Sequence, residues 1–134
     1  MRGKKLMLLI GGRQTQWPAL EYALGELGID DGVLYTNGMD QALMYLGNRE
    51  EPVPSVVLLT LDGGDGLKVL RILKADKRFG RTPVVVLAGS RDERLIDESF
   101  ALGAAGYMVQ PDDSREFAQT IVMINNYWSL SELP

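Results

Sequence analysis

The sequence contains neither cysteine nor histidine among its 134 residues. Without thiols and imidazoles, a chain has no disulfide framework, no Cys/His zinc site, and no catalytic scheme that needs a thiolate nucleophile or an imidazole base. These absences exclude a large part of enzymology.

Long apolar runs are also missing. The N-terminal run from Leu6 to Ile10 follows Lys4 and Lys5, which is the charge order of a signal peptide. It is too short for one and lacks a small-residue cleavage site, so we interpret it as a buried strand. No stretch approaches the ~20 apolar residues of a membrane span. We therefore expect a cytoplasmic protein without membrane contact.

Basic residues are fewer than acidic ones, 14 against 18, and the net charge is −4. Because nucleic-acid binding relies on a basic surface that neutralises phosphates, we expect no nucleic-acid partner. Apolar residues make up 46% of the chain and charged residues 24%, as in an ordinary globular protein. The length predicts one domain over residues 1–134.

Short apolar or β-branched runs alternate with segments of helical character. Strands separated by helices indicate a parallel sheet. The runs VVLLT and VVVLA are apolar at nearly every position, which is typical of strands covered by helices on both faces. The pattern is a (βα)₅ domain with five predicted strands: Leu6–Ile10, Gly32–Thr36, Ser55–Thr60, Pro83–Ala88 and Gly106–Val109.

Turn and cap residues predict where the helices begin and end. Pro18 suits a first helical turn and Gly28 a stop, so we expect a helix at about 17–27 whose inward residues include Leu20, Leu24 and Leu27. The next two helices are expected at about 39–46 and 66–75.

The last two helices are predicted from capping boxes. Ser90 with Glu93 begins a helix that ends at Leu102, and Asp113 with Glu116 begins the last one. The last helix carries one apolar stripe at helical spacing: Phe117, Ile121, Ile124 and Trp128.

Open parallel sheets bind ligands beyond the carboxyl ends of their strands. The residues at these ends form the candidate site: Gly11, Gly12, Thr60, Ala88 and Gln110.

Four segments resemble the receiver domain of bacterial two-component response regulators: PSVVLLT, DGLKVLRILKAD, TPVVVLAGS and LGAAGYMVQP. The ending NNYWSLSELP is similar to the single-domain receivers of the small phytochrome-associated class. The resemblance covers nearly the whole chain. It implies a flavodoxin-like, doubly wound, three-layer fold with strand order 2-1-3-4-5. It also implies partners in signal transduction, such as a sensor kinase, a photoreceptor or another signalling protein.

The site departs from the family at every position that carries its chemistry. In the family an acidic pair ends strand one and holds magnesium, an aspartate ends strand three and accepts the phosphoryl group, a Thr or Ser ends strand four, and a Lys ends strand five. When the chain is aligned on PSVVLLT, Gly11 and Gly12 take the place of the acidic pair, and Thr60 takes that of the aspartate. Ala88 replaces the Thr or Ser, and Gln110 replaces the Lys. The loop after Thr60 is two residues shorter and lacks the family's proline.

These replacements remove the groups that phosphoryl transfer needs. Magnesium prefers near-octahedral oxygen ligands that include carboxylates, and two glycines offer only carbonyls. Thr60 is a poor acceptor without a metal or a base, because transfer depends on positioning and on charge neutralisation. Ala88 cannot donate and Gln110 is uncharged. We expect no metal, no cofactor and no enzymatic activity, and interpret the chain as a pseudo-receiver that works by binding proteins.

Two alternatives remain for this end of the sheet. In one hypothesis, Asp62 or Asp65 is a displaced acceptor. In the simpler one, Asp62 is a turn residue and Asp65 caps a helix. An alignment anchored on Asp65 would place Leu58 at the acceptor position and Pro54 inside a central strand, which a proline disfavours.

The second alternative is a sensor in which the vacated pocket binds a small anion or metabolite. Gly11, Gly12 and Arg13 between a strand and a helix offer backbone N–H groups and a cation. A plain strand-to-helix turn is the simpler interpretation, since neither a Walker lysine nor a full dinucleotide motif is present.

The resemblance also implies an output face between the last strand and its flanking helices. Tyr107 lies where receivers carry a switch aromatic, although a static half-buried tyrosine fits equally. Gln110–Pro111 matches a bond that is usually cis in the family. We expect a homodimer through this face and the C-terminal residues, about 123–134, as in the resembling class; scattered surface residues are the alternative. The proposed contact residues are Phe100, Tyr107, Val122, Met123, Tyr127 and Trp128.

Overall fold

The computed structural model describes residues 7–11, 17–28, 33–36, 38–48, 50, 53–61 and 66–130. Strands and helices alternate along the chain as the apolar runs predict. Their bounds are β1 Met7–Ile10, α1 Trp17–Glu26, β2 Val33–Thr36, α2 Gly38–Gly47, β3 Val56–Thr60, α3 Gly66–Ala75, β4 Val84–Ala88, α4 Glu93–Ala101, β5 Gly106–Val109 and α5 Ser114–Leu130.

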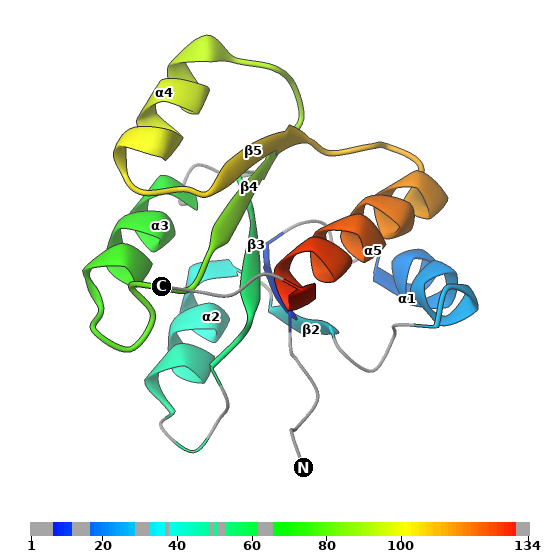
Figure 1. Cartoon of the computed structure of the whole chain (residues 1–134), viewed down its shortest axis with the longest axis horizontal. Coiled ribbons are helices and arrows are strands. Elements are labelled where there is room, and N and C mark those ends of the chain that lie inside the picture. Colours follow the sequence, from blue (N-terminus) through cyan, green and yellow to red (C-terminus); the bar gives the residue numbers. More distant parts are fainter. Residues whose placement is uncertain are drawn as a thin grey trace.

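The five strands form one parallel sheet in the order β2-β1-β3-β4-β5, which confirms the predicted flavodoxin-like topology (Figure 1). The register pairs Leu8 with Val57 and Thr60 with Leu87, so the carboxyl ends of β1, β3 and β4 lie at the same edge. Strand order reverses beside β1, where ligands bind in open sheets.

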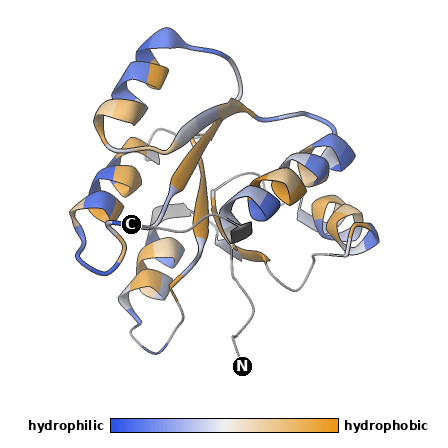
Figure 2. Cartoon of the chain, viewed as in Figure 1, coloured by the Kyte–Doolittle hydropathy of each residue, from blue (hydrophilic) through white to orange (hydrophobic). Residues whose placement is uncertain are grey.

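The helices cover both faces of the sheet, with α1 and α5 on one side and α2, α3 and α4 on the other (Figure 1). Successive strand residues point to opposite faces, and here both faces are buried. Leu8, Val57 and Val86 belong to the core under α2 and α3, whereas Leu9, Leu58 and Leu87 belong to the core under α1 and α5. Figure 2 shows that β3 and β4 are apolar along their length, as expected of strands that are buried on both faces.

Helix α1 ends at Glu26, one residue before the predicted end, and Gly28 follows in the turn with a left-handed φ of +82°. One inward residue was predicted wrongly. Leu20 and Leu24 are buried, whereas the side chain of Leu27 is 42% exposed. The helix stops at Glu26, so Leu27 lies in the turn and leaves the apolar stripe.

The predicted capping box at the start of α4 is also wrong. The N-cap is Asp92, whose Oδ1 accepts hydrogen bonds from the backbone N–H groups of Arg94 and Leu95, at 3.0 and 3.4 Å. A carboxylate two residues beyond Ser90 therefore takes the role. For α5, Asp113 is confirmed as the N-cap, since its Oδ1 accepts a hydrogen bond from Arg115 N at 2.7 Å, whereas the part predicted for Glu116 in a capping box stays a prediction.

The described residues contain no cis peptide bond, so the Gln110–Pro111 bond is trans and the cis isomer implied by the resemblance is wrong. Trans is the ordinary state of an X–Pro bond, favoured by about 0.5–1 kcal/mol. None of the helices in the described ranges is long and apolar enough to cross a membrane.

Candidate functional site

The strand ends gather the candidate residues at one edge of the sheet. Gly11, Thr60, Ala88 and Gln110 each close or directly follow a strand, on β1, β3, β4 and β5. Backbone hydrogen bonds continue past the strands, from Gly11 N to Thr36 O at 3.0 Å and from Gln110 N to Ala88 O at 2.8 Å. The structure therefore brings these four positions together. Gly12, Arg13, Asp62 and Asp65 lie outside the described residues, so the anion-site and displaced-acceptor hypotheses stay predictions.

Thr60 occupies the end of β3 with its hydroxyl turned into the sheet. The residue is only 4% exposed, and its Oγ1 donates a hydrogen bond of 3.1 Å to Ile10 O of the neighbouring strand. A hydroxyl that donates to a buried carbonyl is satisfied where it is. Thr60 thus ties β3 to β1 and does not present a nucleophile at the edge of the sheet.

Gly11 is held against this hydroxyl. Its φ is +88°, a left-handed value that L side chains rarely adopt. A Cβ placed on Gly11 would overlap Thr60 Oγ1. Any side chain at position 11, including the carboxylate of the family, therefore requires a change of backbone conformation or the displacement of Thr60.

The remaining two positions are electrically neutral. Ala88 is buried and offers a methyl group where the family has a hydroxyl, and Gln110 is half-buried and uncharged. Since stabilisation of a transferring phosphoryl group comes from cations and preorganised donors, these residues supply little of it.

Tyr107 is half-buried on β5 and packs against the core under α2 and α3. Its hydroxyl donates a hydrogen bond of 2.9 Å to Ser90 O, which joins β5 to the loop between β4 and α4. This contact fits a static tyrosine, and a switching role stays a prediction.

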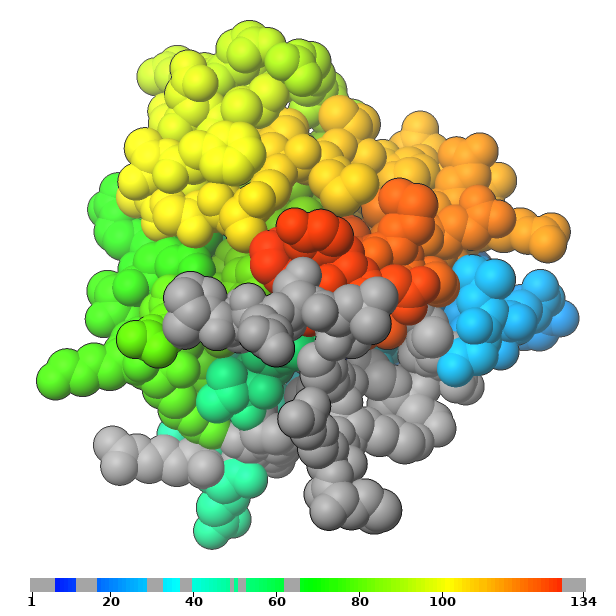
Figure 3. All heavy atoms as spheres, in the orientation of Figure 1, coloured from blue at the N-terminus to red at the C-terminus, as the bar shows by residue number. Residues whose placement is uncertain are grey.

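The surface formed by α4, β5 and α5 is continuous (Figure 3). The side chains of Phe100, Met123 and Tyr127 are 49–63% exposed on it, as an interface requires. Trp128 packs against the core under α1 and α5, with Tyr127 edge-on to its ring at 4.8 Å. Val122 is half-buried. Tyr127 and Trp128 both lie in α5, which extends to Leu130.

Sequence reasoning missed Val109, which is 48% exposed on the same surface at the end of β5. The strand lies at the edge of the sheet, and all four of its residues retain some exposure. Its position last in the predicted strand order was the signal that could have identified it.

Comparison with known proteins gives consistent relatives, although no family model matches the chain. Response regulator Rcp1 from Synechocystis sp. is 25% identical, over 92% of this chain and 88% of that protein. The structure of the phosphorylated cyanobacterial phytochrome response regulator RcpA is 27% identical with a TM-score of 0.80, and the match covers 98% of this chain and 99% of that one. The structure of the bacteriophytochrome response regulator RtBRR is 29% identical with a TM-score of 0.71, and the match covers 92% of this chain and 78% of that one.

The fold, its strand order and these relatives define a response regulator receiver domain, a module of signal transduction. Within that class the chain is close to the small cyanobacterial phytochrome response regulators. Response regulators interact with signalling proteins such as kinases.

Proposed function

We propose that this receiver domain signals without phosphorylation, as a pseudo-receiver that acts by binding other proteins. One observation carries the proposal: the residue at the acceptor position, Thr60, is buried and donates its hydroxyl to Ile10 O, against a glycine that leaves no room for a side chain. We also propose that the chain is not an enzyme.

The relatives supply the contrast. RcpA has been solved in a phosphorylated form, and Rcp1, at 24% identity, in a form that binds Mn²⁺. A divalent cation of this kind requires carboxylate or other oxygen ligands, and a phosphoryl acceptor requires neutralisation of charge. The five matching positions in this chain are two glycines, a threonine, an alanine and a glutamine. They provide no carboxylate and no cation.

Incubation with acetyl phosphate and Mg²⁺, read by intact-protein mass, tests the loss of phosphorylation. We expect the mass to stay unchanged under conditions in which RcpA gains one phosphoryl group. An adduct on Asp62 or Asp65, located by peptide mass spectrometry and abolished by its replacement with Asn, would overturn the proposal and establish a displaced acceptor.

The binding part of the proposal places the contact on the α4–β5–α5 surface, with homodimerisation as its first expected form. Phe100 and Met123 are exposed, so their replacement by glutamate puts charge into an apolar contact without disturbing the core. Trp128 is less suitable, because it packs against the core. The proposed signalling partner is a sensor kinase, a photoreceptor or another signalling protein.

Light-scattering mass of the wild type and of Phe100→Glu/Met123→Glu tests this surface. We expect a dimer that dissociates in the double variant. Tyr22→Glu is the control, since Tyr22 is exposed on α1, which is not part of the α4–β5–α5 surface, and the change should leave the dimer intact. A monomeric wild type, or a double variant that remains dimeric, would rule out this interface.

A further inference from the structure

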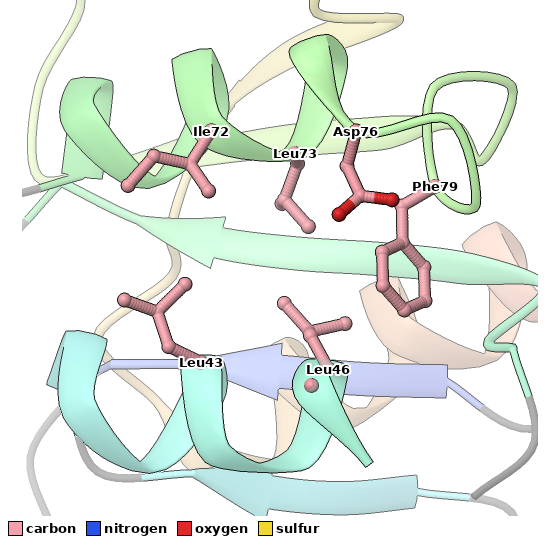
Figure 4. A pocket seen from close by; sticks show the side chains of 7 residues that line it. Leu43, Leu46, Ile72, Leu73, Asp76 and Phe79 are labelled. Atoms are coloured by element: carbon pink, nitrogen blue, oxygen red, sulfur yellow. The ribbon is translucent and has the colours of Figure 1, made fainter. Parts of the chain in front are cut away.

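A groove with an apolar floor lies between α2 and α3, away from the carboxyl ends of the strands. It has a volume of about 150 Å³ and is lined by Leu43, Leu46, Gly47, Ile72, Leu73, Asp76 and Phe79. In Figure 4 the leucines of α2 point toward Ile72 and Leu73 of α3, and the ring of Phe79 closes one end. A cavity of about 150 Å³ lined by such residues can hold a benzene-sized group. The groove therefore fits one large apolar side chain.

Positive charge borders this groove. A second hollow adjoins the first, sharing Leu46, Gly47, Asp76 and Phe79 with it, and adds Lys77 and Arg78. Lys77 is exposed. Lys68 lies one helical turn before Ile72 and so on the same face of α3.

Arg78 is held in place at the groove. Its Nη1 donates to Leu46 O and to Asn48 O, both at 3.1 Å, and its guanidinium lies 4.9 Å from the centre of the Phe79 ring. The carbonyls and the ring orient the guanidinium. Asp76 also lines the groove, and it accepts a hydrogen bond from Arg78 N at 2.7 Å. Glu50 and Glu51 follow α2 in the sequence.

The charge of this region opposes that of the rest of the chain. Residues 66–82 contain six basic residues and one acidic residue, a net charge of +5, whereas the whole chain carries −4. One of the six, Lys74, is directed inward, with its Nζ donating to Thr82 O at 2.7 Å and Gly80 O at 3.3 Å. The others make α3 and the following turn a basic strip on an acidic protein.

We propose that the α2–α3 groove binds an acidic amphipathic segment of a partner protein. One large apolar side chain of the segment enters the pocket, and its carboxylates lie against Lys77, Arg78 and Lys68. Charge complementarity selects this partner: the basic strip attracts an acidic segment, whereas the net charge of −4 disfavours its approach to the protein as a whole. A nucleic acid offers phosphates but no apolar side chain for the pocket. The groove is separate from the α4–β5–α5 surface, so the inference does not rest on the proposed function.

The probe is a labelled synthetic helical peptide of about 15 residues, with leucine and tryptophan on one face and glutamate on the other. A peptide of the same composition, scrambled so that the faces mix, is its control. Backbone amide NMR shifts locate the binding site, and fluorescence anisotropy gives the affinity at low and high salt.

Two variants with matched controls test the contacts. Ile72→Glu puts a charge into the pocket, and Leu27→Glu makes the same change at a residue that is equally exposed, 42%, on the α1 side of the sheet. Lys77→Glu reverses a charge at the groove, and Arg115→Glu reverses one on α5, where Arg115 is likewise exposed. All four positions are on the surface, so the fold is retained.

We expect shifts centred on residues 43–47 and 72–79, a loss of at least tenfold in affinity for Ile72→Glu, and a smaller loss with a weaker salt dependence for Lys77→Glu. Both controls should bind as the wild type does. Shifts confined to other surfaces, equal binding of the scrambled peptide, or no effect of Ile72→Glu would overturn the proposal. So would a DNA duplex that binds the groove more tightly than the peptide.

Discussion

Gly11→Ala places a methyl group where Thr60 Oγ1 lies, and its cost can be worked out from the structure. The left-handed backbone of Gly11 disfavours an L side chain by about 1–2 kcal/mol. Displacing Thr60 breaks its hydrogen bond to Ile10 O and leaves buried polar atoms unpaired, which costs about 1–3 kcal/mol. Reduced freedom of the unfolded chain returns about 0.4–1 kcal/mol. The variant should therefore lose about 1–5 kcal/mol.

Gly28→Ala isolates the backbone part of this cost. Gly28 has nearly the same φ, +82° against +88°, but an added Cβ meets nothing within 4 Å. It should lose only about 1 kcal/mol, since the left-handed penalty is partly offset by the unfolded-state gain. The difference between the two variants measures the overlap at Thr60.

Thr60→Ala provides the converse test. The single variant removes the hydroxyl and its hydrogen bond, and in the Gly11→Ala background it removes the atom with which the new methyl group collides. The double variant should therefore lose less than the sum of the single losses, by about 1–2 kcal/mol, as is typical of residues in contact.

Urea unfolding followed by circular dichroism gives the free energies, and thermal melting provides a second measure at roughly 3–5 °C per kcal/mol for a chain of this length. Equal losses for Gly11→Ala and Gly28→Ala, or additive losses in the double variant, would refute the coupling of Gly11 to Thr60.

Two further predictions concern groups that the proposed site does not use. Ser99 is fully buried in α4, and its Oγ has no hydrogen-bond partner among the described residues. Ser99→Ala should therefore stabilise the fold by about 0.5–1.5 kcal/mol, measured by urea unfolding. A clear loss of stability would mean that the hydroxyl is satisfied. Burial lowers the pKa of Lys74 below its ordinary 10.5, so between the lowered pKa and 10.5 the unfolded chain binds more protons than the folded one. The stability of the wild type relative to Lys74→Met should therefore rise with pH through that window, and a difference that stays constant from pH 8 to about 10.5 would contradict the assignment.

The architecture could be predicted from the sequence because both faces of the sheet are buried. The runs VVLLT and VVVLA admit few other structures, and every predicted strand lies within one residue of the observed one over the described positions. The start of α4 could not be chosen in the same way. Ser90 and Asp92 both suit an N-cap, and the local pattern does not say which of them the chain uses.

The candidate site was predictable as a set of residues but not as a set of contacts. The sequence identifies Gly11 and Thr60 as strand ends, whereas the hydrogen bond from Thr60 to Ile10 joins residues 50 positions apart and depends on the register of β1 against β3. The α2–α3 groove was missed for the same reason, since it combines α2 with α3 and the turn that follows α3, which lie far apart in the sequence. The basic composition of residues 66–82 was the signal available beforehand.

The contact between Gly11 and Thr60 also bears on whether the phosphorylation chemistry could return by single changes. An aspartate at position 11 carries the same Cβ as an alanine and meets the same overlap, so Thr60 has to change first. An aspartate at position 60 without an acidic pair and its metal is a carboxylate at a 4% exposed site, near the Ile10 carbonyl to which Thr60 now donates. Burial without a partner disfavours its charged form, the form that attacks a phosphoryl group. Each single reversal is therefore unfavourable, and under the proposed function this coupling preserves the loss of phosphorylation once it has occurred.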